Sequence, residues 1–255
     1  MKTAYKFHGA GNDFILIDCF ENKENFSEKE IEAVCNRHTG IGGDGLILIE
    51  KSKKASFRMV YFNSDGKEAE MCGNGARCTF AFAFSKKYCN SHDSFEASDG
   101  LHYGIMISEN NHEWIVRVTL RVSAAPSEIE DGSYFANTGV PHNVRMVNDI
   151  SVIDVKTEGS KLRHNRQLFP DGANINFVSL KNNELYIRTY ERGVEDETLA
   201  CGTGITASAL VANAFFGLSF PVTIHAVGGL LRVDEQNGLL WLEGPARHVF
   251  TSNYF

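Results

Sequence analysis

The sequence has no long hydrophobic run, and this limits where the protein can work. Its apolar stretches, such as FILI and LILI, are far shorter than the roughly 20 residues that a membrane helix needs. The N-terminus, MKTAYKFHGAGNDF, lacks the apolar core of a signal peptide. We therefore expect a cytoplasmic protein without a membrane partner.

Positive charge is also scarce. The 255 residues include 25 Lys and Arg against 32 Asp and Glu, which gives a formal net charge of −7. The two signs are interspersed, and no basic stripe of the kind that follows a nucleic-acid backbone is present. Nucleic acid is therefore not an expected partner, and a small molecule is.

Closely spaced metal ligands are absent as well. There are six cysteines, but no two of them form a CxxC pair of the kind that builds zinc sites. In a reducing cytosol thiols stay reduced. We expect no structural metal, and we interpret four of the thiols as small buried apolar residues: Cys19, Cys35, Cys78 and Cys89.

What the sequence does contain is an internal repeat. The segment MCGNGARC, residues 71–78, has a counterpart in ACGTG, residues 200–204, and the two motif cysteines lie 201 − 72 = 129 residues apart. The same shift pairs further identical residues: Tyr61 with Tyr190, Glu68 with Glu197, and Gly100 with Gly229. Because the same shift of 129 residues holds in several separated segments, the sequence predicts two copies of one fold unit, with a boundary near residue 113. Because no Pro- or Ser-rich linker marks that boundary, we expect the halves to pack tightly.

Local patterns predict strands around one central helix in each half. ARCTFAFAFSKK and ITASALVANAFFG are helical segments without a polar face, and such helices belong inside a core. Ser27 and Glu30 form a capping box that opens a further helix through about His38. DVKTEGSKLRHN is another helical segment. Residues 4–18 are typical of a strand or hairpin with GAGND as its turn, and most of the remaining apolar segments are typical of strands.

Each motif cysteine is expected at a strand-to-helix junction. A helix N-terminus presents unpaired N–H groups and partial positive charge, so it can bind a carboxylate and lower the pKa of an adjacent thiol. Two such junctions facing each other could place a thiol on each face of one carbon atom. A thiolate would take the α-proton while the opposite thiol gives one, which inverts the stereocentre without pyridoxal phosphate.

Several polar residues at strand ends and turns could serve such a site. Taken singly, the asparagines fit turn residues with local hydrogen bonds, and Glu191-Arg192 fits a solvated charge pair. Taken together, they could converge on one cleft in which Arg192 holds a carboxylate bidentately. The candidates are Asn12, Asn63, Asn174, Glu191 and Arg192. The plain alternative is that both motif cysteines are inert residues in helix-packing turns.

Four segments carry a resemblance to a known family: FHGAGNDF, FNSDGKEAEMCGNGARC, YERGVEDETLACGTG and GPARHVF. Over essentially its whole length the chain resembles the diaminopimelate epimerases, which are cofactor-independent isomerases of lysine and peptidoglycan precursor synthesis. The resemblance implies an α/β (α+β) fold of two pseudo-symmetric domains, each an antiparallel β-sheet or barrel wrapped around a central apolar helix. The domains would be residues 1–113 with the C-terminal strand 246–255, and residues 114–245. It also implies a homodimer, no cofactor and an amino-acid substrate.

The resemblance further implies roles for individual residues. Cys72 and Cys201 would be the acid/base pair, with His142 and Glu191 each beside one thiol. Backbone N–H groups would hold the reacting carboxylate, namely those of Gly73, Asn74, Gly202 and Thr203. Side chains that would contact the substrate are Asn12, Asn63, Asn174, Glu191 and Arg192.

Two positions depart from the family pattern. Val140 stands where many members have Asn before the Pro-His pair, and Gly45 stands where some have Gln. Both family residues touch the distal end of the substrate, so a racemase of another amino acid remains an alternative. A third hypothesis is a non-catalytic module that binds anions at its glycine-rich helix starts.

Overall fold

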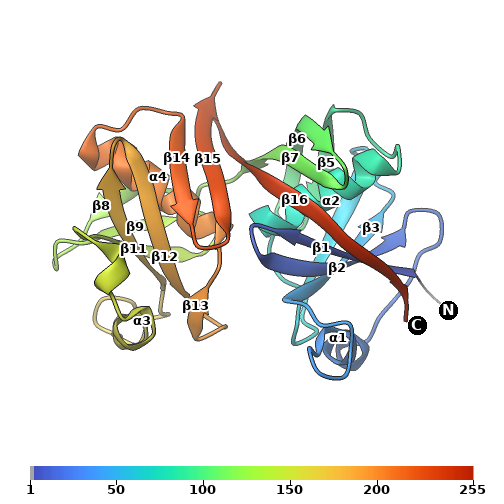
Figure 1. The fold of residues 1–255 in the computed structure, drawn as a ribbon, viewed down its shortest axis with the longest axis horizontal. Helices are drawn as coiled ribbons and strands as arrows, with labels where there is room; N and C mark the ends of the chain where they lie inside the picture. Colours follow the sequence, from blue (N-terminus) through green and yellow to red (C-terminus); the bar gives the residue numbers. More distant parts are fainter. Residues whose placement is uncertain (1–2, 255) are drawn as a thin grey trace. The chain divides into compact units, whose positions relative to one another are not determined.

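The computed structural model describes residues 3–254 and divides the chain into two compact units (Figure 1). Unit 1 runs to Thr119 and resumes at Gly244, and unit 2 is Leu120–Glu243. The division falls after the boundary expected near residue 113 because β7 (Glu113–Leu120) pairs with β6 (Gly100–Asn110) of unit 1. Within the described residues, no helix is long and apolar enough to cross a membrane.

Unit 1 is a closed barrel around one helix. Its strands follow the order β1-β2-β3-β4-β5-β6-β7-β16, and β16 also pairs with β1. The remaining bounds are β1 Thr3–Gly9, β2 Asn12–Cys19, β3 Gly45–Glu50, β4 Phe57–Asn63, β5 His92–Ala97 and β16 Leu239–Asn253. The hairpin expected over residues 4–18 is confirmed by β1 and β2.

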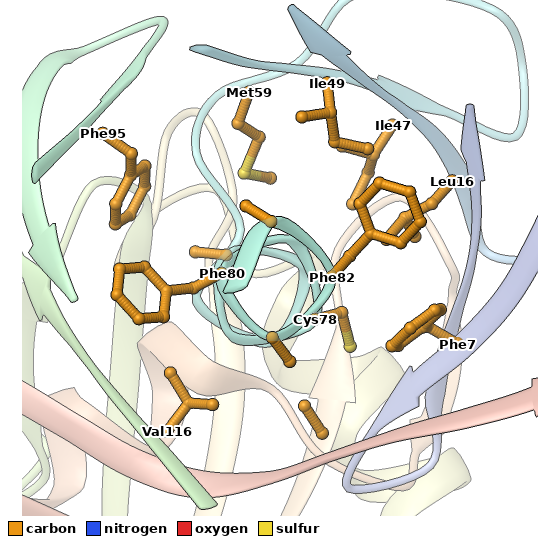
Figure 2. Close-up of a cluster of buried hydrophobic side chains, with 14 of the residues drawn as sticks. Phe7, Leu16, Ile47, Ile49, Met59, Cys78, Phe80, Phe82, Phe95 and Val116 are labelled. Atoms are coloured by element: carbon orange, nitrogen blue, oxygen red, sulfur yellow. The ribbon is translucent and has the colours of Figure 1, made fainter. Parts of the chain in front are cut away.

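Helix α2 (Gly73–Ser85) fills this barrel, and Figure 2 views it with strand side chains on every side. Every residue from Gly73 to Ala83 is buried, which confirms the prediction of a core helix. Phe80 reaches the sheet only because Gly104 has no side chain, since a Cβ there would lie 2.2 Å from the Phe80 ring. Large rings on the helix are thus matched by a missing side chain on the strand.

Unit 2 repeats the plan with different side chains. Its strand order is β16-β15-β14-β12-β11-β10-β9-β8, and β13 pairs with β12. Helix α4 (Gly202–Phe216) packs on these strands through small and branched residues such as Ala209 and Val211. The strands are β8 Ala124–Glu128, β9 Tyr134–Asn137, β10 Pro141–Met146, β11 Asn174–Lys181, β12 Glu184–Glu191, β13 Asp196–Thr198, β14 Val222–Ala226 and β15 Gly229–Gln236. The α/β fold with one central helix in each half is confirmed.

Two shorter helices lie outside the barrel cores. Helix α1 (Glu28–Cys35) opens with the predicted capping box, in which Ser27 and Glu30 bond each other's backbone N–H groups. It ends three residues before His38 because Asn36 is extended and its side chain accepts the N–H groups of His38 and Thr39. Helix α3 (Val155–Arg163) falls within the predicted DVKTEGSKLRHN segment and is capped by Asp154.

The C-terminal strand expected over residues 246–255 is not a separate element. It is the second part of β16, which begins at Leu239 and runs through the Gly244-Pro245 pair as one strand. Residues 239–243 pair with β15 and residues 247–253 pair with β1, so the pair that would break a strand lies between two pairing segments. The elements β8, β9, β13 and the 3₁₀ turn Ile150–Val152 were not anticipated from the sequence.

Candidate active site

Both motif cysteines are N-cap residues of the central helices. Cys72 precedes α2 with φ −99° and ψ 120°, and Cys201 precedes α4 with φ −109° and ψ 107°. Neither side chain caps its own helix by a hydrogen bond, so each sulfur lies beside a helix start without covering it. The partial positive charge of a helix N-terminus favours the thiolate form of such a cysteine.

In unit 1 the cysteine joins a chain of amide side chains. The Cys72 Sγ lies 3.7 Å from Oδ1 of Asn12, which also accepts a hydrogen bond of 3.2 Å from Nδ2 of Asn74. The Asn12 amide nitrogen in turn donates to Asp44 at 2.6 Å. Asn12, at the start of β2, therefore links two other predicted site residues, Cys72 and Asn74.

Behind Asn12 lies a network of ion pairs. Arg37 bridges the carboxylates of Asp13 and Asp44, and Lys6 forms a second ion pair with Asp13. Burial alone would raise the pKa of Asp13, but the hydrogen bonds from Arg37 and Lys6 outweigh it and lower that pKa to about 2. Burial and the charge of Asp13 raise the pKa of Asp44. The network anchors the N-terminal turn that carries Asn12.

In unit 2 the polar groups lie beneath the helix start. A Cβ on Gly204, in the first turn of α4, would lie 2.3 Å from the Asn176 amide oxygen and 3.3 Å from Cε1 of His142. His142 is fully buried, and burial, followed by the charge of Arg192, lowers its pKa to about 3. The imidazole is therefore neutral near pH 7.

The tautomer of His142 follows from its neighbours. Asn176 accepts from the Thr189 hydroxyl through Oδ1 and donates to the Asn143 carbonyl through Nδ2, which fixes the amide orientation. The same Nδ2 lies 3.2 Å from Nδ1 of His142, so Nδ1 accepts and Nε2 carries the proton. Among the described residues this Nε2 has no hydrogen-bond partner, although it is buried.

The remaining candidates of unit 2 lie at strand ends. The N–H of Arg192 donates to Oδ1 of Asn174 at 2.7 Å, while its guanidinium donates to the Asp171 carbonyl. Asn174 is the parallel partner of His142 across β10 and β11. Glu191 accepts from the Thr198 hydroxyl at 2.9 Å, and the Thr203 carbonyl accepts from Thr138. The structure thus joins Asn174 with Arg192 directly.

Asn63 lies apart from the amide chain, at the exposed end of β4, and pairs with Gly45 on β3. A Cβ on Gly45 would lie 2.3 Å from the Phe62 carbonyl oxygen and 2.6 Å from the Tyr61 ring. No side chain fits there without a backbone shift. The packing of β3 against β4 therefore requires glycine at position 45, where some members of the family that the sequence resembles have glutamine.

Sequence reasoning missed several polar residues of these regions: Asp44, Arg77, Thr138 and Asn176. Three of them carried a signal. Asp44 lies in the glycine-rich GIGGDG segment, and Arg77 lies within MCGNGARC itself. A polar residue within the apolar strand segment NINFV was the signal for Asn176, which is fully buried.

The other four cysteines have thiols of raised pKa. Burial raises the pKa of Cys19 and of Cys35 to about 11, and that of Cys78 and of Cys89 to about 12. These thiols stay protonated near pH 7. Cys89 was expected to be buried but is partly exposed, because it follows the C-terminal end of α2.

The fold is shared with solved structures whose sequences differ widely from that of this chain. A hydroxyproline epimerase from Agrobacterium vitis matches with a TM-score of 0.74 at 14% identity, over 98% of this chain and 91% of that one. A phenazine biosynthesis protein of the PhzF family from Bacillus anthracis matches with a TM-score of 0.69 at 14% identity, over 98% of each chain.

At the level of sequence, the family model for diaminopimelate epimerase matches residues 4–120 and 134–249, and the chain belongs to that family. The diaminopimelate epimerase of Flavobacterium psychrophilum is 43% identical over 96% of this chain and 97% of its own. That of Chlorobaculum tepidum is 42% identical over 95% of this chain and 97% of its own.

Proposed function

We propose that the protein interconverts LL- and meso-2,6-diaminopimelate without a cofactor, with Cys72 and Cys201 as its acid/base pair. The observation that carries the proposal is the duplicated N-cap cysteine, one at the start of each buried central helix, in a chain of the diaminopimelate epimerase family. An isomerase of this kind supplies a precursor of lysine and peptidoglycan.

The chemistry assigns complementary tasks to the two sulfurs. One thiolate breaks the C–H bond at the α-carbon and takes the proton as an S–H bond. The other thiol gives its proton to the opposite face of the carbon, which closes a new C–H bond of inverted configuration. The cycle ends with the proton on the first sulfur and the thiolate on the second, so the reverse reaction starts from the product state. The chemistry requires both sulfurs to reach the same carbon.

The α-carboxylate is the natural ligand of the two helix starts. Backbone N–H groups of Gly73 and Asn74 in unit 1, and of Gly202 and Thr203 in unit 2, lie in the first turns after the cysteines. These groups favour the negative charge that develops when the proton leaves. Because this stabilisation comes from fixed dipoles, the reaction needs no electron sink such as pyridoxal phosphate.

His142 and Glu191 act through hydrogen bonds near the site. With a pKa of about 3, His142 is a neutral imidazole whose Nε2–H is available beneath the first turn of α4. This supports a hydrogen-bonding role for His142 in place of proton transfer. Glu191, held by Thr198 at the end of β12, is proposed to act beside the other thiol and on the substrate.

The distal amino-acid group of diaminopimelate would be held by Asn63, Asn174 and Arg192. An arginine can bind a carboxylate through two parallel hydrogen bonds, and amide oxygens can accept from an ammonium. The Arg192 guanidinium has one described bond, to a backbone carbonyl, which leaves N–H groups for a ligand. We further propose that the protein works in the cytoplasm as a homodimer, which sedimentation equilibrium would test.

Incubation with LL-diaminopimelate in deuterated water tests the function. Deuterium at one α-carbon, together with a mixture of LL and meso forms, is the expected result. Exchange with a different amino acid, and none with diaminopimelate, would identify a racemase of altered distal specificity, which Val140 and Gly45 would explain. Binding without exchange would identify an anion-binding module and contradict the proposal.

A further inference from the structure

Helix α2 carries a buried arginine one turn after the cysteine junction. The side chain of Arg77 is fully buried and heads the largest such side chains in the described residues. Burial lowers the pKa of Arg77 to about 10, so the guanidinium is still cationic near pH 7. A buried cation is costly unless its surroundings compensate it, so its neighbours indicate its purpose.

The hydrogen bonds of Arg77 within residues 3–254 all go to neutral acceptors. Nη2 donates to Oδ1 of Asn74 at 2.8 Å, Nη1 to the Gly73 carbonyl at 3.3 Å, and Nε to the Pro245 carbonyl at 3.4 Å. No carboxylate is among these acceptors, although an arginine is almost never fully buried without a pairing partner. Two of the three acceptors belong to the helix start that follows Cys72.

These bonds fix the direction of an amide. Because Oδ1 of Asn74 accepts from Arg77, its Nδ2 must point the other way, toward Oδ1 of Asn12. That same Asn12 oxygen lies 3.7 Å from Sγ of Cys72. Gly9 of β1 leaves room for the guanidinium at this place, since a Cβ there would lie only 3.3 Å from Nη2. Arg77 therefore orients the groups around the sulfur.

The charge of Arg77 also acts on nearby thiols. The titratable groups that favour its charged form are Cys78 and Cys72. Burial raises the pKa of Cys78 to about 12, so that thiol stays neutral. The carboxylates reached through Asn12 are Asp44 and Asp13, and both are paired with Arg37. Cys72 is thus the group whose anionic form gains from this cation.

Unit 2 has no equivalent cation at this position. The shift of 129 places Thr206 where unit 1 has Arg77, and the Thr206 hydroxyl donates to the Gly202 carbonyl at 2.9 Å. Two residues further the units agree, since Thr79 and Ser208 each donate to the carbonyl four residues earlier. The difference is therefore specific to the turn next to the cysteine.

We propose that Arg77 is a positioning residue for the Cys72 half of the site, which holds the Asn74 amide and the first turn of α2 in place and stabilises the thiolate of Cys72. This proposal rests on the proposed function, but its test does not require turnover. Alkylation of the thiol reports on Cys72 even if the substrate is another amino acid.

The experiment measures the rate of iodoacetamide alkylation against pH, with the modified peptide identified by mass spectrometry. Cys72 is followed in a Cys201→Ala background, and Cys201 in a Cys72→Ala background. Arg77→Gln removes the charge but keeps donors for Asn74, whereas Arg77→Lys keeps the charge. The remaining four cysteines react slowly near pH 7 because their pKa values are raised.

Arg77→Gln is expected to lower the alkylation rate of Cys72 at pH 7 by about tenfold, which corresponds to a pKa raised by one unit, and to leave Cys201 within about twofold. Arg77→Lys should restore most of the rate. An unchanged Cys72 rate, an equal loss at both cysteines, or no recovery with lysine would each overturn the proposal. If Arg77→Gln does not fold, Arg77→Lys tests the proposal by itself. A Cys72 pKa in this variant that differs by more than about one unit from that in the unsubstituted protein would contradict the proposal.

Discussion

The two cysteine junctions have the same backbone but different surroundings. In unit 1 polar groups lie beside the helix start, where Asn12, Asn74 and Arg77 form one chain, while Ile47 and Met59 lie beneath Gly75. In unit 2 the polar groups lie beneath the helix start, where Asn176 and His142 take that place under Gly204. A duplicated fold has thus kept the cysteine geometry and distributed charge unequally.

This difference bears on the proposed reaction, in which the two thiols play equivalent parts although their surroundings differ. The proposed cycle exchanges thiol and thiolate between the two sulfurs, so neither form can be stabilised too strongly at either place. A permanent cation acts near Cys72, whereas the first turn of α4 has a neutral imidazole beneath it. The environments of the two thiols can therefore be tuned separately by substitution.

The largest expected effect is the loss of either thiol. Cys72→Ala and Cys201→Ala should each lower epimerisation by about 10³-fold or more, since each removes one partner of a proton transfer. The assay is conversion of LL- to meso-diaminopimelate, and circular dichroism checks that each variant is folded. If one variant keeps substantial turnover, the two thiols are not equivalent partners and the two-base mechanism is wrong.

The next effect concerns the central helices. Phe80 and Gly104 of unit 1 correspond, under the shift of 129, to Ala209 and Val233 of unit 2, so the large residue has moved from helix to strand. Phe80→Ala should cost about 3–5 kcal/mol of unfolding free energy, and Gly104→Val about 1–3 kcal/mol or more. The double variant reproduces the unit 2 arrangement.

Because the two residues touch, the double variant should be more stable than the sum of the single costs by about 1–3 kcal/mol. Urea unfolding measures all three, and Ala209→Gly in unit 2 provides a control with a cost of about 1 kcal/mol. Strict additivity would mean that the two units do not share an interchangeable core.

Acid should affect the units in different pH ranges. His142 has a folded-state pKa of about 3, below the ordinary value of 6.5, so the unfolded chain binds its proton first as the pH falls. Its contribution is constant above pH 6.5 and is lost between pH 6.5 and 3, by about 1 kcal/mol per pH unit. Asp13 of unit 1, with a pKa lowered to about 2, loses its contribution only below about pH 3.8.

His142→Gln keeps a neutral polar side chain and removes this titration. The unfolding free energy of the variant, measured in urea at several pH values, should fall less steeply from pH 6.5 to 4 than that of the unsubstituted protein. Asp93→Asn is the control in unit 1 and should leave the slope in that range unchanged, because hydrogen bonds from Ser56 and Asn90 outweigh burial and lower the pKa of Asp93. Parallel curves for the His142 variant and the unsubstituted protein would contradict the burial argument.

The sequence predicted the elements whose signals are local. The capping box at Ser27, the apolar central helices and the hairpin at Gly11 depend on neighbouring residues, and each is present. It also placed both cysteines at helix starts, because the glycines after them mark the junctions.

Features that depend on distant residues were missed. The continuous strand β16 could not be predicted, because a Gly-Pro pair is a local signal for the end of a strand. The strand continues past this pair because its two parts pair with strands from elsewhere in the chain. Likewise, Arg77 meets the Pro245 carbonyl, 168 residues away, only because β16 returns to the barrel around α2. The neutral state of His142 follows from complete burial, which no local pattern specifies.

The smallest expected effect separates the two departures from the family pattern. Position 45 of unit 1 accepts only glycine, because a Cβ there would meet the backbone of Phe62. Gly45→Gln should therefore destabilise the fold without improving substrate binding. Val140 of unit 2 is only partly buried and precedes Pro141 at the start of β10, so Val140→Asn can be accommodated. If position 140 faces the distal group of diaminopimelate, the added amide should lower KM by about threefold to tenfold, the value of one hydrogen bond, and leave kcat unchanged. An effect on kcat alone would place position 140 near the reacting carbon and contradict a distal role.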